Sequence, residues 1–160
     1  MITVRGCDED GTSTAQQWSV VGDTWIVGCA MPESMIYPEL NAESPDAMHL
    51  DRTSELGIYE RGCGLDATLC AFGHDEYMYN VLVGNNCPIP EEGLYMIRFH
   101  SFYPWHKERE YTWMENEKDR EMMPWVLEFN KFDLYSKADE YPDIEKCRPY
   151  YDVFFLQSRF

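Results

Sequence analysis

The stretch that decides the fold is GHDEYMYNVLVGNNCPIPEEGLYMIRFHSFYPW, residues 73–105. Its centre, 84–92, combines a Gly-Asn-Asn sequence that favours the end of one helix with a Pro-Glu pattern that favours the start of another. The apolar spacing on either side predicts two antiparallel helices, one over 65–84 and one over 90–104. The first is apolar on two faces, so we expect it to be buried from two sides.

Outside this hairpin, the pattern predicts further helices and a long irregular region. A third helix is expected to start near Pro124, and a fourth is expected over 144–156. The charge-dense run 107–121 is typical of a solvated connection or a surface helix. Residues 31–57 are polar and interrupted by prolines, which indicates a long loop on the N-terminal side. The fold class that follows is all-α.

Composition narrows the possible partners. The chain has 160 residues, of which 44% are apolar and 26% charged, as in a globular domain with its own core. Only 1–16 is polar, acidic and without periodicity, and we expect it to be a disordered leader. The net charge of −16 repels phosphate and anionic lipid, which argues against nucleic acid and membrane partners. The six cysteines form no C-x-x-C pair and are interpreted as reduced thiols of a cytoplasmic protein.

Two histidines are expected to meet across the hairpin. His74 lies ten residues before Gly84, and His100 lies ten residues after Pro90. At a rise of about 1.5 Å per residue, both are roughly 15 Å from the turn and therefore level with each other. Helix axes about 8–10 Å apart allow two such imidazoles to bind one metal ion. The alternative is a pair of hydrogen-bonded core histidines.

A carboxylate on the third helix is a further candidate ligand. Asp133 lies one helical turn after Phe129, so its side chain is expected on the apolar face, where it needs a cation. A metal ion would provide that charge, and so would Arg98 or Lys131. Two histidines and one carboxylate suit iron, manganese or zinc. The two remaining histidines are interpreted as exposed bystanders: His49 and His106.

Several longer motifs point to a known family. They are GHDEYMY (73–79), YMIRFHSFYPWH (95–106), PWVLEFNKFDLY (124–135), RPYY (148–151), QWSVVGDTWIVGC (17–29) and SELGIY (54–59). Together they closely resemble the myo-inositol oxygenases over roughly residues 17–152. The resemblance implies a helical HD-domain fold. It also implies a non-haem di-iron enzyme that uses O₂ to cleave the ring of myo-inositol to D-glucuronate.

The resemblance also implies roles for individual residues. His74 and His100 match ligands of one iron, and Asp133 matches a ligand of the other. Contacts with inositol hydroxyls are implied for a short set of residues: Gly22, Asp23, His100 and Ser101. Asp75 follows His74, but this pair matches a later motif than the His-Asp dyad after which the superfamily is named. The resemblance therefore does not make Asp75 a ligand.

Residues 17–160 resemble the C-terminal half of the family, as a partial HD-domain-like bundle. The H-D-x-G-K segment, which in the family supplies further iron ligands and a substrate-binding Lys, does not occur in this sequence. We therefore expect the chain alone to be inactive, with only part of the iron-ligand set. Uncovered apolar faces would favour self-association. The alternative is a non-catalytic module, derived from the oxygenase, that binds polyol, metal or a protein partner.

Overall fold

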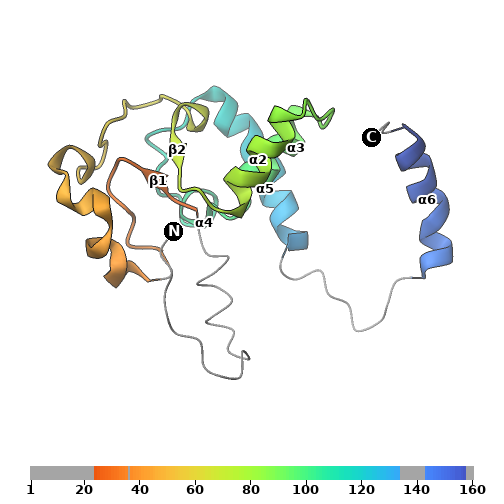
Figure 1. Cartoon of the computed structure of the whole chain (residues 1–160), viewed down its shortest axis with the longest axis horizontal. Helices are drawn as coiled ribbons and strands as arrows, with labels where there is room; N and C mark the ends of the chain where they lie inside the picture. The colour runs from red at the N-terminus through yellow and green to blue at the C-terminus, as the bar shows by residue number, and fades with distance from the viewer. Residues whose placement is uncertain (1–23, 36, 134–142, 158–160) are drawn as a thin grey trace, which may run out of the picture.

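Helices dominate the computed structural model, which describes residues 24–35, 37–133 and 143–157. The α-helices are α2 (His74–Gly84), α3 (Glu91–Phe99), α4 (Tyr103–His106), α5 (Glu117–Asp133) and α6 (Ile144–Gln157), as Figure 1 shows. Strands β1 (Ile26–Val27) and β2 (Leu69–Cys70) form one short antiparallel pair. The all-α fold class is confirmed. The expected loop before the hairpin contains three short 3-10 turns: Pro38–Glu43, Pro45–Met48 and Leu50–Arg52.

The helical hairpin is present, but both of its helices are shorter than expected. α2 begins at His74 because Leu69 and Cys70 pair with β1 through backbone hydrogen bonds and cannot be helical. α3 ends at Phe99, and the chain turns before α4, where Pro104 occupies the first turn. Asn86, with φ of 52°, adopts the left-handed conformation that ends α2.

α5 begins seven residues before the expected start at Pro124, which lies inside the helix. Its N-terminus is a reciprocal cap. Asn116 Oδ1 accepts the Asp119 N–H at 3.1 Å, and Asp119 Oδ2 accepts the Asn116 N–H at 2.8 Å. The two bonds satisfy helix-end donors that otherwise lack partners, so the helix can start within the charge-dense run. The expected fourth helix is confirmed as α6.

The charge-dense run 107–121 is not solvated throughout, contrary to expectation. Tyr111, Met114 and Glu115 are buried, and Glu115 accepts a 2.9 Å hydrogen bond from the indole Nε1 of Trp105. Glu115 also pairs with Arg109 at 3.1 Å. The apolar residues of this run therefore help to fill the core, and Glu115 is buried beside them.

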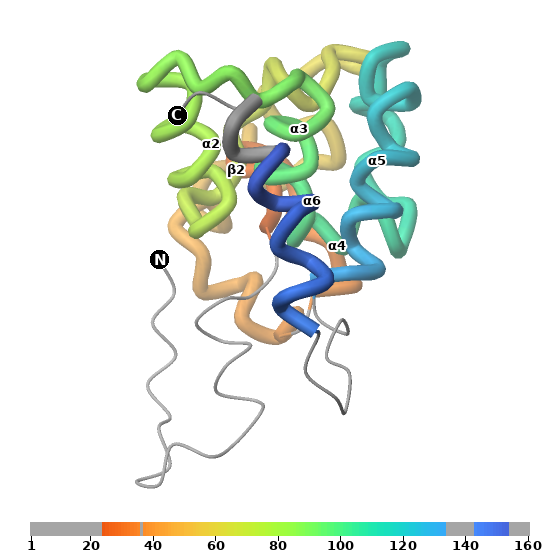
Figure 2. The backbone as a smooth tube through the Cα atoms, turned by 90° about the vertical axis from the view of Figure 1, so that its right-hand side faces the viewer, coloured from red at the N-terminus to blue at the C-terminus, as the bar shows by residue number. Residues whose placement is uncertain are grey.

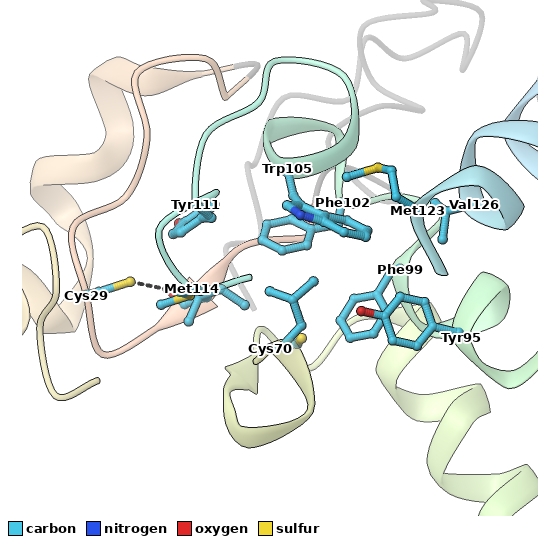
Figure 3. Packing of buried hydrophobic residues seen from close by; sticks show 12 residues of the cluster. Cys29, Cys70, Tyr95, Phe99, Phe102, Trp105, Tyr111, Met114, Met123 and Val126 are labelled. Carbon is cyan, nitrogen blue, oxygen red and sulfur yellow. Dashed lines mark hydrogen bonds between the residues drawn. The ribbon is translucent and has the colours of Figure 1, made fainter. Parts of the chain in front are cut away.

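The core lies between the hairpin, α4, α5 and the β1–β2 pair, and Figure 3 shows its aromatic centre. Phe99, Phe102 and Trp105 have no exposed surface, and their rings pack with centroids 5.9–6.4 Å apart. Each such side chain contributes roughly 1.5–3 kcal/mol through burial. The rest of the buried cluster surrounds them: Ile26, Cys29, Leu65, Cys70, Tyr95, Tyr111, Met114, Met123 and Val126.

The second apolar face of α2 is uncovered in the described structure, contrary to the expected burial from two sides. Asp75 is the buried residue of this helix, whereas Tyr77, Met78 and Val81 are exposed. α6 lies at one end of the long axis in Figure 1, and Figure 2, viewed from that end, shows it in front of the other helices. Among the described residues, no helix is long and apolar enough to cross a membrane.

Candidate metal centre

His74 and His100 meet at the end of the hairpin that lies away from its turn. His74 is the first residue of α2, and His100 follows the last residue of α3. Their Nε2 atoms are 3.0 Å apart, and their rings are nearly perpendicular, with an interplanar angle of 79°. The prediction that the two imidazoles lie level with each other is confirmed. His74 is exposed and His100 is half-buried, so the pair is open to solvent on one side.

The hydrogen bonds of His100 direct one ring nitrogen toward His74. His100 Nδ1 lies 2.8 Å from the carbonyl oxygen of Ile97. Because a carbonyl oxygen only accepts, Nδ1 carries the proton, and in the neutral ring the lone pair is on Nε2. Phe129 of α5 contacts the same ring, with centroids 5.9 Å apart. The orientation of His100 is thus fixed from two sides, as is typical of a metal-binding histidine.

Asp133 does not join the two histidines in the described structure. It is the last residue of α5 and is exposed, so the expectation that its carboxylate lies on a buried apolar face and needs a cation there is wrong. The two alternative cations have other partners. Arg98 pairs with Glu76 and Asp66, and Lys131 pairs with Glu128. Among the described residues, no three His, Cys, Asp or Glu side chains form a group that could hold a metal ion.

Ser101, an expected substrate contact, is buried beside the histidine pair. Its hydroxyl donates a 2.7 Å hydrogen bond to Asp75 Oδ2, and its oxygen lies 3.2 Å from the hydroxyl oxygen of Thr24. Gly22 and Asp23, the other two expected contacts, lie outside the described residues. Sequence reasoning missed the contact between Asp75 and Ser101. The sequence did indicate this contact, because Asp75 directly follows His74 and Ser101 directly follows His100.

His106 is not an exposed bystander. It is buried, and its Nε2 donates a 2.9 Å hydrogen bond to the carbonyl oxygen of His100. Burial lowers the pKa of His106 by desolvating the charged form, and this outweighs the opposing effect of the hydrogen bond. His106 therefore supports the backbone at the candidate site as a neutral residue. His49 is exposed, as expected.

Comparisons with known proteins decide the family. The family model described as myo-inositol oxygenase matches residues 12–158. The chain belongs to the myo-inositol oxygenase family. Inositol oxygenase from Danio rerio is 56% identical over 136 residues, which make up 84% of this chain and 49% of that protein. Those from Dictyostelium discoideum and Homo sapiens are 53% and 50% identical and are matched over 46% and 48% of their lengths.

The chain spans about half the length of the curated relatives it matches. Two of its family motifs, 73–79 and 95–106, contain the histidines that converge in the hairpin. Nitrogen ligands about 2.1 Å from one metal ion and at right angles to each other are roughly 3 Å apart. The 3.0 Å separation of the Nε2 atoms fits this spacing. The same distance is also that of a hydrogen bond between the two rings, and the described residues place no third ligand group beside the pair.

Proposed function

We propose that this chain forms part of the di-iron centre of an inositol oxygenase. His74 and His100 bind one iron, and Asp133 binds the other. The substrates are myo-inositol and O₂, and the product is D-glucuronate. The observation that supports this proposal most strongly is the 3.0 Å separation of the two Nε2 atoms in a chain of this family.

The chain's own residues prepare the site for a neutral polyol and a metal ion. Bound iron supplies the chemistry that activates O₂ and removes hydrogen from a substrate carbon. His100 is held in one tautomer by Ile97, so its free nitrogen is available to a cation. The Ser101 hydroxyl donates its hydrogen bond to Asp75, so its oxygen can accept a hydrogen bond from a hydroxyl of inositol. Gly22, Asp23 and His100 are the other proposed substrate contacts.

We expect the 160 residues alone to form no D-glucuronate, since the described part of the chain holds only two converging ligands. The missing ligands are proposed to lie in a segment equivalent to the other half of the family. The test mixes the purified chain and ferrous iron with a separately produced N-terminal half of the Danio rerio relative. D-glucuronate and bound iron are then measured against each half alone. We expect the product from the mixture only.

Histidine variants make this experiment specific. His74→Ala and His100→Ala should each abolish the product and lower bound iron in the mixture. His49→Ala, at an exposed histidine outside the pair, should behave like the parent chain. Product formation that survives both His74→Ala and His100→Ala would refute the proposed ligand assignment.

A non-catalytic interaction module is the second candidate function, and the exposed apolar surface favours it. Tyr77, Met78 and Val81 on α2, together with Trp125 and Phe132 on α5, are exposed. Exposed apolar side chains on each of these helices are what a contact with another protein chain, including a second copy, would cover. Copurification with a full-length relative and calorimetry with myo-inositol distinguish the two candidates. A chain that binds neither would not be such a module.

We expect the protein to act in the cytosol, where thiols stay reduced. The five cysteines that the structure describes are free.

A further inference from the structure

A buried carboxylate lies directly beside the histidine pair. Asp75 is 1% exposed and accepts hydrogen bonds from two distant parts of the chain and from the residue next to it. Its Oδ2 accepts the hydroxyl protons of Thr24 and Ser101, and its Oδ1 accepts the Glu76 N–H at 2.9 Å. We refer to Thr24, Asp75 and Ser101 as the Asp75 cluster. It connects the segment before β1, the first turn of α2 and the turn after α3.

The proton count shows that Asp75 is the acceptor on which the cluster depends. Each hydroxyl has one proton to donate, and both protons are directed at Asp75 Oδ2. Thr24 and Ser101 therefore have no hydroxyl proton left for a hydrogen bond with each other, although their oxygens are 3.2 Å apart. Thr24 also donates its backbone N–H to the carbonyl oxygen of Ser101 at 3.0 Å. Removing the carboxylate would leave two buried hydroxyls without their acceptor.

The cluster joins the two histidines through their sequence neighbours. Asp75 follows His74, and Ser101 follows His100, so the 2.7 Å hydrogen bond between Asp75 and Ser101 links the backbones from which both imidazoles project. We propose that Asp75 is a positioning residue that holds His74 and His100 at the separation needed to share one metal ion. This inference rests on the proposed role of the histidines as iron ligands.

A second buried carboxylate provides a matched control. Asp119 is also 1% exposed and also connects three parts of the chain, through the Leu65 N–H, the Tyr95 hydroxyl and the Asn116 N–H. None of these hydrogen bonds involves His74, His100 or a residue next to either. Asp119→Asn and Asp75→Asn therefore both disturb a buried carboxylate that accepts hydrogen bonds from three residues. Only Asp75→Asn removes the link between the histidines.

The first experiment measures the histidine pair without any metal. In the complete 160-residue chain, the NMR cross-peak between the ring protons of His74 and His100 reports their contact, since the ring centroids are 5.0 Å apart. We expect Asp75→Asn to remove this cross-peak and Asp119→Asn to keep it. Ser101→Ala, which removes one hydroxyl of the cluster, should weaken the cross-peak. This variant tests the inference if Asp75→Asn does not fold. An unchanged cross-peak in Ser101→Ala and Asp75→Asn would overturn the inference, and so would an equal loss in Asp119→Asn.

The second experiment titrates the same variants with Co²⁺, followed by its visible absorption. Partners that orient a metal-binding histidine typically change metal affinity by about 10- to 100-fold. We expect the Kd for Co²⁺ to rise at least about tenfold in Asp75→Asn and to stay near that of the parent chain in Asp119→Asn. An equal rise of the Kd in both variants would show that Asp75 stabilises the fold but does not position the histidines. A parent chain that binds no Co²⁺ would show that the two histidines alone do not hold a metal ion, and the cross-peak would then decide whether Asp75 positions the pair.

Discussion

The two helices of the hairpin differ sharply in what they bury. α3 places Tyr95, Arg98 and Phe99 in the interior, whereas the buried residue of α2 is Asp75. α3 packs against both α2 and α5, and Figure 2 shows it between them. α2 packs against α3 on one side, and its Met78 is 45% exposed on the other. α3 is therefore the central helix of the described fold, and α2 is an outer one.

Several polar contacts join the two helices. Arg98 of α3 binds Glu76 of α2 at 2.7 Å, and its guanidinium lies 4.6 Å from the ring centroid of Tyr79. Asp75 of α2 binds Ser101 just beyond α3. Directional bonds of this kind fix a position more narrowly than apolar contact does, because they weaken steeply when distance or angle changes. α2 is therefore oriented by polar contacts, whereas α3 is held by the aromatic core.

The largest expected effect is on the buried side of α3. Phe99→Ala removes a side chain with no exposed surface from the aromatic centre, and it should lower the free energy of unfolding by about 3–5 kcal/mol. Urea unfolding followed by tryptophan fluorescence measures this. Phe72→Ala, at a phenylalanine that is 71% exposed, is the control and should change the free energy little. Similar losses in both variants would contradict a core centred on α3.

The polar contact between α2 and α3 should come second. Arg98→Ala leaves Glu76, which is largely buried, without its cation and should cost about 2–3 kcal/mol, as expected for hydrogen bonds to charged groups. Arg61→Ala breaks an exposed ion pair with Glu55 and should cost under about 1 kcal/mol. Both values come from urea unfolding at one ionic strength. If Arg98→Ala costs no more than Arg61→Ala, polar contacts do not orient α2.

A smaller effect is expected at the C-terminal end of α3, where His106 binds the His100 carbonyl oxygen. Since burial lowers the pKa of His106 below its ordinary value of 6.5, the unfolded chain takes up the proton first as the pH falls. The free energy of unfolding should therefore fall below about pH 6.5, by no more than about 1.4 kcal/mol per pH unit for one proton. The fall ends once His106 is also protonated in the folded chain.

His106→Gln isolates this contribution, because the Gln amide keeps an N–H donor and does not titrate. Urea unfolding between pH 8 and 5 should show a flatter profile for this variant than for the parent chain. His49→Gln, at an exposed histidine, is the control and should retain the profile of the parent. Profiles that coincide for the parent chain and His106→Gln would show that the burial of His106 has no effect on stability.

The smallest effect on stability is expected on the outer face of α2. The double variant Met78→Ser and Val81→Ser should change the free energy of unfolding by no more than about 0.5 kcal/mol, because both side chains are exposed. It should nevertheless weaken self-association, as measured by sedimentation velocity. Asn80→Ser, at an exposed polar position of the same helix, should leave association unchanged. If the double variant associates as strongly as the parent chain, this face is not the contact surface.

The hairpin was predictable because its signals are local. Gly84 and the Pro-Glu pattern after it fix the turn, and the helical rise then places His74 level with His100 without any knowledge of the rest of the fold. The start of α2 was not predictable from the same pattern. Leu69 and Cys70 also fit the helical spacing, but they pair with β1, more than forty residues earlier in the chain. Competition from such a distant partner does not appear in a local pattern.

By itself, the sequence determined the all-α class, the resemblance to the family and the meeting of two histidines, since motifs and helical periodicity depend on neighbouring residues. Which polar side chains are buried depends instead on the tertiary structure. Asp75 and His106 are polar residues whose burial depends on hydrogen-bond partners at Ser101 and His100. Asp133, which the helical pattern places on an apolar face, is exposed in the structure. A periodic pattern identifies a face of a helix, but the segments that cover that face determine whether it is buried.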